Sequence, residues 1–166
     1  MKLRIAGIND DSVVDGDGVR LTVFTQGCLH HCPGCQNPET HAVAGGYIID
    51  TDDILARLAS NPLLSGVTFS GGEPFLQPIP LTALAQQIHA KGLDIWTYTG
   101  FTLEELINQH NQAITTLLQE IDVLVDGRYD DTQRDLTLHF RGSKNQRVID
   151  LAKWRQDQKI HLLYTS

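Results

Sequence analysis

Residues 19–35 read VRLTVFTQGCLHHCPGC, an apolar, strand-like run that leads directly into a loop. This loop holds Cys28, Cys32 and Cys35, which are the only cysteines of the chain. Functional groups of parallel sheets gather at the carboxyl ends of the strands, so we expect the cysteines at that edge. The stretch therefore predicts a parallel sheet with a thiolate site at one edge.

Five further runs are rich in β-forming residues, and several are nearly continuous in apolar character, as is typical of parallel strands covered on both faces. They span residues 66–70, 93–98, 121–125, 136–140 and 160–164. Helical patterns lie between them, and the last one is expected to include residues 148–152. Their start signals are Thr51-Asp52-Asp53, Pro80 and the capping boxes Thr102–Glu105 and Ser143–Gln146.

The alternation of strands and helices predicts an α/β fold with mostly parallel strands joined by right-handed crossovers. Five to six strands are too few for a complete eight-stranded barrel. We therefore expect a partial, open (β/α) barrel of five to six mostly parallel strands. No repeat or linker divides the sequence, so residues 1–166 are expected to form a single domain.

The composition argues against several classes of partner. The formal net charge is −7, whereas binding to a nucleic-acid backbone needs clustered lysines and arginines. No apolar run approaches the roughly 20 residues that cross a bilayer, and the N-terminus lacks the apolar region of a secretory signal. We expect no nucleic-acid partner, no membrane partner and a cytoplasmic location. An odd number of cysteines also argues against a disulfide framework, which leaves metal or redox chemistry.

The cysteine spacing predicts a metal site with an open position. A [4Fe–4S] cluster normally takes four thiolates, one for each iron, so three ligands leave one iron free to bind another molecule. An open coordination position distinguishes a catalytic metal site from a closed structural one. The alternative is a zinc site with His30, His31 or His41 as the fourth ligand, although no second pair of ligands stands elsewhere at zinc-site spacing.

A second motif, Ser70-Gly71-Gly72-Glu73-Pro74, follows the second strong strand. Its two glycines let the backbone approach a ligand closely, and the carboxylate of Glu73 can accept hydrogen bonds from an ammonium group. The alternative is a plain tight turn, which Gly-Gly and Pro often form. Its expected place at the same sheet edge as the cysteines favours the functional interpretation.

Together, the C-x3-C-x2-C loop and the Gly-Gly-Glu-Pro motif resemble those of the radical S-adenosylmethionine superfamily. The resemblance implies that the three cysteines hold a [4Fe–4S] cluster, and that its open iron binds the methionine moiety of S-adenosyl-L-methionine. It implies no catalytic residue beyond the cluster ligands. The residues that it assigns to this cofactor are Gly34, Cys35 and Gln36 for the adenosyl part, Gly72 and Glu73 for the amino group, Thr97 and Thr99 for ribose and carboxylate, and Asp126 at the end of the fourth strand.

Within this superfamily the chain is similar to the glycyl-radical-enzyme activases, and more narrowly to the family of anaerobic ribonucleoside-triphosphate reductase-activating proteins. The similarity extends from about residue 12 to about residue 152. The segments that carry it are DGDGVR (15–20), QGC (26–28), CPGC (32–35), CQNPE (35–39), IWTYTG (95–100), VLVDG (123–127) and RGSKNQR (141–147).

The narrower resemblance implies an activity. An electron from an external donor such as flavodoxin or ferredoxin would cleave S-adenosylmethionine to methionine and a 5′-deoxyadenosyl radical. This radical would then take a hydrogen atom from a glycine on the large subunit of anaerobic ribonucleoside-triphosphate reductase. The segment Arg141-Gly142-Ser143 is expected at a helix start, where it could bind a carboxylate of the cofactor or the partner protein.

Three alternatives stay open at this point. One keeps the cofactors but replaces the protein substrate by a small molecule, as in enzymes of the 7-carboxy-7-deazaguanine synthase type. Another is a zinc-binding interaction module without catalytic activity. For Asp126, a turn acid on the surface is as consistent with the sequence as a cofactor contact.

Overall fold

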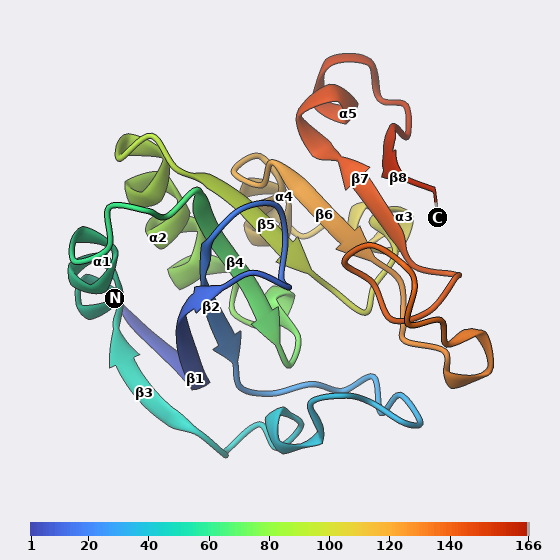
Figure 1. The fold of residues 1–166 in the computed structure, drawn as a ribbon, viewed down its shortest axis with the longest axis horizontal. Coiled ribbons are helices and arrows are strands. Elements are labelled where there is room, and N and C mark those ends of the chain that lie inside the picture. The colour runs from blue at the N-terminus through green and yellow to red at the C-terminus, as the bar shows by residue number, and fades with distance from the viewer. Residues whose placement is uncertain (166) are drawn as a thin grey trace.

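The computed structural model describes residues 1–165. Across these residues the strands form one sheet in the order β3-β1-β2-β4-β5-β6-β7-β8, which Figure 1 shows from the side that the helices leave open. The strands are β1 (Lys2–Ser12), β2 (Arg20–Thr25), β3 (Tyr47–Asp50), β4 (Gly66–Gly71), β5 (Asp94–Tyr98), β6 (Val123–Asp126), β7 (Arg147–Asp150) and β8 (Leu162–Tyr164).

Each α-helix lies in a connection between two of these strands. The α-helices are α1 (Thr51–Ala59), α2 (Pro78–Ala90), α3 (Leu103–Asn108), α4 (Gln112–Leu118) and α5 (Leu151–Asp157). Single 3-10 turns are η1 (Pro38–Thr40), η2 (Pro74–Leu76) and η3 (Asp131–Gln133). None of the helices within residues 1–165 has the length and apolar character that a membrane crossing requires.

The α/β class is confirmed, but the sheet is mixed rather than mostly parallel. Only β2, β4, β5 and β6 pair in parallel, and the neighbours on both sides pair antiparallel. Parallel neighbours need a crossover connection, which α1, α2 and the pair α3–α4 provide. Between β6 and β7 the chain instead forms a loop, residues 127–146, that contains no α-helix, and β7 returns antiparallel.

Two predicted elements near the C-terminus are wrong. Residues 136–140 lie in the 127–146 loop, not in a strand, and residues 147–150 form β7 where a helix was expected. Val148 and Ile149 are fully buried, so pairing with β6 outweighs the helical signal. The helix begins only at α5, where the Asp150 carboxylate accepts a hydrogen bond from the N–H of Lys153. The side chain of Gln146 accepts hydrogen bonds within the loop instead of capping a helix.

Other local predictions are confirmed. Thr102 and Glu105 form both hydrogen bonds of a capping box at the start of α3. The helix α1 ends before Asn61-Pro62, and α2 ends shortly before Gly92, whose φ is +77°. The sequence interpretation missed β1 and β3, which pair with each other and extend the sheet beyond β2.

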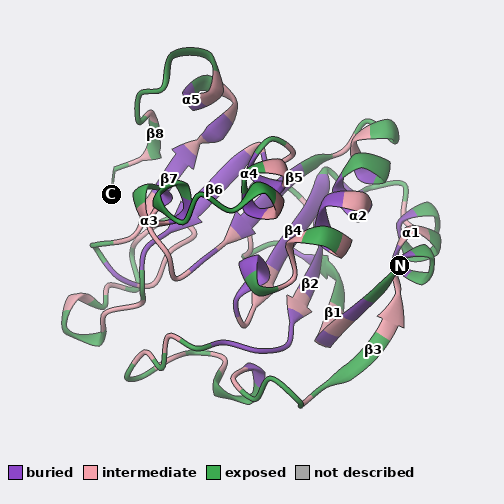
Figure 2. Ribbon diagram, turned by 180° about the vertical axis from the view of Figure 1, so that it is seen from behind, coloured by how far each residue is buried: buried purple, intermediate pink, exposed green. Residues whose placement is uncertain are grey.

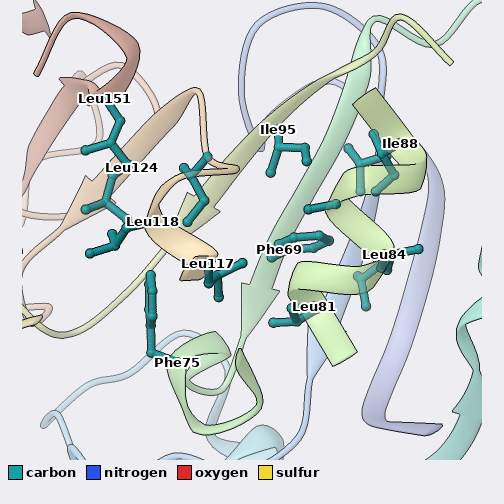
Figure 3. Packing of buried hydrophobic residues seen from close by; sticks show 14 of the residues in the cluster. Phe69, Phe75, Leu81, Leu84, Ile88, Ile95, Leu117, Leu118, Leu124 and Leu151 are labelled. Atoms are coloured by element: carbon teal, nitrogen blue, oxygen red, sulfur yellow. The ribbon is translucent and has the colours of Figure 1, made fainter. Parts of the chain in front are cut away.

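The main core lies between the sheet and the helices that cover one of its faces. Figure 2 shows α1, α2 and α4 in front of the sheet from this side. Phe69 and Ile95 project from β4 and β5 toward α2, and both side chains are fully buried (Figure 3). Burying a side chain of this size stabilises the fold by about 1.5–3 kcal/mol. The α2 residues that meet them are Leu81, Leu84, Ala85 and Ile88.

The opposite face of the sheet has a smaller cluster around Trp96 and is crossed by residues 13–19, the loop between β1 and β2 (Figure 1). The backbone oxygen of Asp15 accepts a hydrogen bond from Thr68 Oγ1 at 2.7 Å, which fixes this loop on the sheet. Arg20 is fully buried beside it and pairs with Asp94 at 2.6 Å. This face therefore has loops where the other face has helices.

Candidate cofactor site

The cysteine loop lies at the carboxyl edge of the parallel strands, as predicted from the sequence. Its chain runs along the ends of β2 and β4 in Figure 1. The N–H groups of Gly27 and Cys28 donate to the oxygens of Thr40 and His41, at 2.7 and 3.1 Å, and close the loop. Its three cysteines line one cavity of about 370 Å³, together with Gln36 and Asn37 of the same loop.

The thiols differ in exposure. Cys28 is buried, whereas Cys32 and Cys35 are partly exposed. Burial raises the pKa of Cys28 above the ordinary thiol value, and the N–H of His30 only partly offsets this. Burial also raises the pKa of Cys32, against the opposing effect of a backbone N–H of Tyr129. Thiolate ligands must lose their protons on metal binding, so loading this site would release protons.

The Gly-Gly motif brings a second loop against the cysteine loop. The N–H of Gly72 donates to the Thr25 oxygen at 2.8 Å, and that of Glu73 donates to the Gly27 oxygen at 2.7 Å. A Cβ atom on Gly72 would lie 2.3 Å from the Gly27 oxygen. The neighbouring backbone therefore requires glycine at position 72. Ser70, Gly71 and Gly72 all line the cavity.

The carboxylate of Glu73 lies behind this wall and is 1% exposed. Its Oε1 lies 2.6 Å from Nε2 of His30 and accepts from the N–H of Gly100 at 2.9 Å. The hydroxyl of Thr99 lies 2.8 and 2.9 Å from the two carboxylate oxygens, and the N–H of Phe75 donates to Oε2 at 3.1 Å. Glu73 is thus a hydrogen-bonded junction between the Gly-Gly-Glu-Pro loop, the cysteine loop and the end of β5.

The structure brings some of the predicted cofactor residues together and not others. Those that line the cavity with the cysteines are Gln36, Gly72 and Thr99. Gly34 has a φ of +72° and lies against Asp131 rather than on the cavity wall. Thr97 and Asp126 also lie off the wall.

The alternation of side chains along a strand explains the last two positions. Ile95 of β5 and Leu124 of β6 belong to the core on the helix side, whereas Trp96 and Val125 belong to the cluster on the open face. Residues two positions apart in a strand point to the same face of the sheet. Thr97 therefore shares the helix side with Ile95, and Asp126 shares it with Leu124. Tyr98, with the opposite parity, lines the cavity.

Several cavity residues were missed or assigned differently from the sequence. His30 was considered only as a zinc ligand, and Tyr98 was not considered. Arg141 and Gly142 line the cavity from the 127–146 loop rather than from a helix start. The Nη1 of Arg141 donates to the Tyr164 oxygen at 3.0 Å, while its buried Nε has no hydrogen-bond partner within the described chain.

Comparisons with known proteins show which family the chain belongs to. A family model described as a 4Fe-4S single cluster domain matches residues 14–149. The anaerobic ribonucleoside-triphosphate reductase-activating protein of Salmonella typhi is 40% identical over 147 residues, which cover 84% of this chain and 93% of that protein. The chain belongs to this family of activating proteins. The protein of the same name from Enterobacteria phage T4 is 31% identical over 152 residues, with 87% and 93% of the two chains covered.

The fold is shared more widely than the sequence. The crystal structure of QueE from Escherichia coli matches with a TM-score of 0.50 at 13% identity, covering 76% of this chain and 71% of that one. This likeness concerns the fold alone. Family membership makes the chain a radical S-adenosylmethionine enzyme with a [4Fe–4S] cluster.

The donor set of the cavity fits such a cluster. In residues 1–165 no three side chains of His, Cys, Asp or Glu converge closely enough to hold one metal ion. A [4Fe–4S] cluster takes one thiolate per iron, so its ligands surround a group of atoms and need not converge on a single point. The three cysteines that line this cavity can supply three such thiolates.

Proposed function

We propose that the chain generates a glycyl radical on anaerobic ribonucleoside-triphosphate reductase by reductive cleavage of S-adenosylmethionine. The observation that carries this proposal is the cavity at the sheet edge. It gathers all three cysteines, the Gly-Gly loop and Thr99 on one wall, in a chain that is 40% identical to a named activating protein.

Cys28, Cys32 and Cys35 would hold three irons of the cluster and leave the fourth iron open to the amino and carboxylate groups of the cofactor. Their shared cavity supports this ligand count. Gly72 and the charge of Glu73 behind it suit the amino group. Thr99 would lie near the methionine part of the cofactor, because its hydroxyl contacts Glu73, which is assigned to the amino group of that part.

The adenosyl part would lie along Cys35 and Gln36. Arg141 also lines the cavity; it carries an N–H with no partner among the described residues and suits a carboxylate. Gly34, Thr97 and Asp126 act indirectly in this assignment, because their side chains or backbone lie off the cavity wall.

When bound, the cluster and S-adenosylmethionine would supply cleavage of the sulfonium by one electron from the external donor, giving methionine and a 5′-deoxyadenosyl radical. This radical would take one hydrogen atom from a glycine α-carbon and become 5′-deoxyadenosine. The chain's part is to orient the cofactor and to exclude water and stray C–H bonds. The loop 127–146 and Val14 line the cavity beside the cysteines and suit this shielding role.

The partner would be the large subunit of the reductase, which presents its glycine at the cavity mouth. Leu136 lines the cavity and is 77% exposed, as expected for a rim residue that a protein partner covers. The electron would come from an external donor of the flavodoxin or ferredoxin type, as the resemblance to the activases implies.

Electron paramagnetic resonance tests the proposal directly. The anaerobically reconstituted protein is incubated with reductase, reductant and S-adenosylmethionine. A glycyl doublet on the reductase, with one methionine formed per radical, is the expected result. Cleavage of the cofactor without such a signal, or turnover with a small molecule in the absence of reductase, contradicts it.

Cys28→Ala is the matched control for the cluster. Loss of the Cys28 thiolate is expected to abolish both iron uptake and radical formation. The two remaining thiolates cannot hold the three irons that the proposal assigns to protein ligands. Analysis of iron and sulfide should give about four irons per chain in the unmodified protein. One zinc per chain without sulfide would indicate a zinc-binding module instead.

A further inference from the structure

His30 joins the two loops that the proposed function assigns to the two cofactors. It lies in the three-residue spacer between Cys28 and Cys32, and its ring lines the cavity. Its Nε2 lies 2.6 Å from Oε1 of Glu73, and its side chain is 7% exposed. An ionised carboxylate can only accept hydrogen bonds, so Nε2 is the donor in this contact.

The surroundings hold the His30 ring in this place. The ring of Phe101 meets it edge to face, with 4.6 Å between the ring centroids. Gly100 provides the space, because a Cβ atom there would lie 2.5 Å from Cδ2 of His30. The contact with Glu73 is therefore part of a packed arrangement and not a surface encounter.

The hydrogen bonds of Glu73 show what His30 contributes. The carboxylate has four donor groups, two of them backbone N–H groups, and the hydroxyl of Thr99 can donate its one proton to only one oxygen at a time. About four lone-pair positions are available on a carboxylate, so these donors fix its orientation and leave its charge, rather than a further hydrogen bond, to act on the amino group. His30 is the only one of the four that comes from the cysteine loop.

We propose that His30 is a positioning residue for S-adenosylmethionine: it fixes the carboxylate of Glu73 next to the cofactor's amino group and ties it to the cluster loop. The proposal depends on the proposed function only in assigning the amino group to Glu73. Without the His30 donor, the buried carboxylate loses one of its hydrogen bonds and its tie to the cysteine loop, so its position next to the amino group is no longer fixed.

Two substitutions that differ by one methylene group test this role. In His30→Gln the terminal amide nitrogen can still reach Glu73, whereas in His30→Asn it stops short. We expect His30→Asn to raise the dissociation constant of S-adenosylmethionine about tenfold or more, and His30→Gln to stay within about threefold of the unmodified protein. Equilibrium dialysis on anaerobically reconstituted protein measures this constant without turnover. Iron content is determined on the same samples.

Two controls separate positioning from a general effect on the loop. Leu29→Ala, at a 65% exposed position in the same spacer, should leave affinity and iron content unchanged. In a Glu73→Gln background, the difference between Asn and Gln at position 30 should disappear, because the carboxylate through which His30 acts is gone.

Equal affinities of the Asn and Gln variants would overturn the proposal. Loss of iron in either variant would also overturn it, because the contact would then serve cluster assembly. These outcomes are independent of the proposed function, which depends on the glycyl doublet of the unmodified protein. A doublet together with equal affinities rejects the role of His30 alone.

Discussion

Asp126 accepts two hydrogen bonds from the guanidinium group of Arg147, from Nε at 3.0 Å and from Nη2 at 2.5 Å. The two residues are direct partners in the antiparallel pair β6–β7. The carboxylate is 1% exposed and also accepts the N–H of Leu103 at the start of α3, at 2.8 Å. Asp126 therefore fastens β7 and α3 to the parallel strands, which favours a structural role over the cofactor contact expected from the sequence.

We expect Asp126→Asn to lower the free energy of unfolding by about 2–3 kcal/mol, because it leaves Arg147 with a weakened partner at a buried position. Affinity for S-adenosylmethionine should not change. Urea denaturation and equilibrium dialysis measure the two quantities. Glu104→Gln is the matched control, since Glu104 contacts the same guanidinium from a 54% exposed position and should contribute at most about 1 kcal/mol. Normal stability with weakened cofactor binding would contradict this assignment.

The hydroxyl of Thr97 is buried and has no hydrogen-bond partner within the described residues. A buried hydroxyl without a partner costs about 1–3 kcal/mol, so Thr97→Val should stabilise the fold by about 1 kcal/mol without affecting cofactor binding. Thr99→Val, two residues further on, removes a donor to Glu73 and should both destabilise the fold and weaken binding. Thermal unfolding and dialysis of the two variants distinguish them. Weaker cofactor binding in Thr97→Val would contradict this and support the contact between Thr97 and the cofactor that was expected from the sequence.

Thr97 and Asp126 show what the sequence could and could not predict. The cysteine spacing and the Gly-Gly-Glu-Pro motif are local patterns, so they sufficed to predict that the two loops meet at the carboxyl edge of the sheet. Thr97 and Asp126 were assigned by their position at strand ends, without regard to the face of the sheet. Ile95 and Trp96 are both apolar, so the sequence does not show that they belong to cores on opposite faces; the structure does, and it indicates Tyr98 instead.

Other differences depend on contacts between distant segments. Val148 and Ile149 follow a sequence that suits a helix start, but pairing with β6 makes them a strand. The role of His30 depends on Glu73, 43 residues further along the chain, and no spacing within either motif predicts that contact. Local signals thus predicted most helices and the meeting of the two loops, whereas sheet edges and buried pairs required the three-dimensional structure.

His89 should make stability depend on pH. Burial alone would lower its pKa, but the carboxylates of Asp122 and Glu120, at 2.9 and 3.1 Å, outweigh this and raise the pKa above its ordinary value of 6.5. A raised folded-state pKa stabilises the fold fully below the unfolded pKa, and the contribution is lost as pH rises through the folded pKa.

The effect should be at most about 1 kcal/mol, because the His89 side chain is 32% exposed. Urea denaturation of the cluster-free protein between about pH 5.5 and 9 measures it, with pH values bracketing the ordinary pKa of histidine. The stability difference between the unmodified protein and His89→Gln should shrink as pH rises. A difference that stays constant or grows with pH would show that His89 contributes through packing.

Arg141 is expected to bind a carboxylate through the N–H that has no partner among residues 1–165. Arg141→Gln should therefore raise the dissociation constant of S-adenosylmethionine about tenfold, as the loss of one charged hydrogen bond implies. Arg134→Gln, on an exposed part of the same loop, is the control and should have no effect. Unchanged affinity combined with impaired radical formation would instead place Arg141 at the interface with the reductase.

The surface that the reductase would cover includes the cavity rim. Leu136 and Leu63 are both 77% exposed, but only Leu136 lines the cavity. Leu136 is at the rim of the cavity but would be covered by the reductase, and a charge buried in a protein interface typically costs more than 1 kcal/mol, so Leu136→Asp should slow glycyl radical formation at least about fivefold. Binding and reductive cleavage of S-adenosylmethionine should persist, because the substitution is on the rim. Leu63→Asp should leave all three unchanged, and equal losses in both variants would show that the leucine is not at the interface.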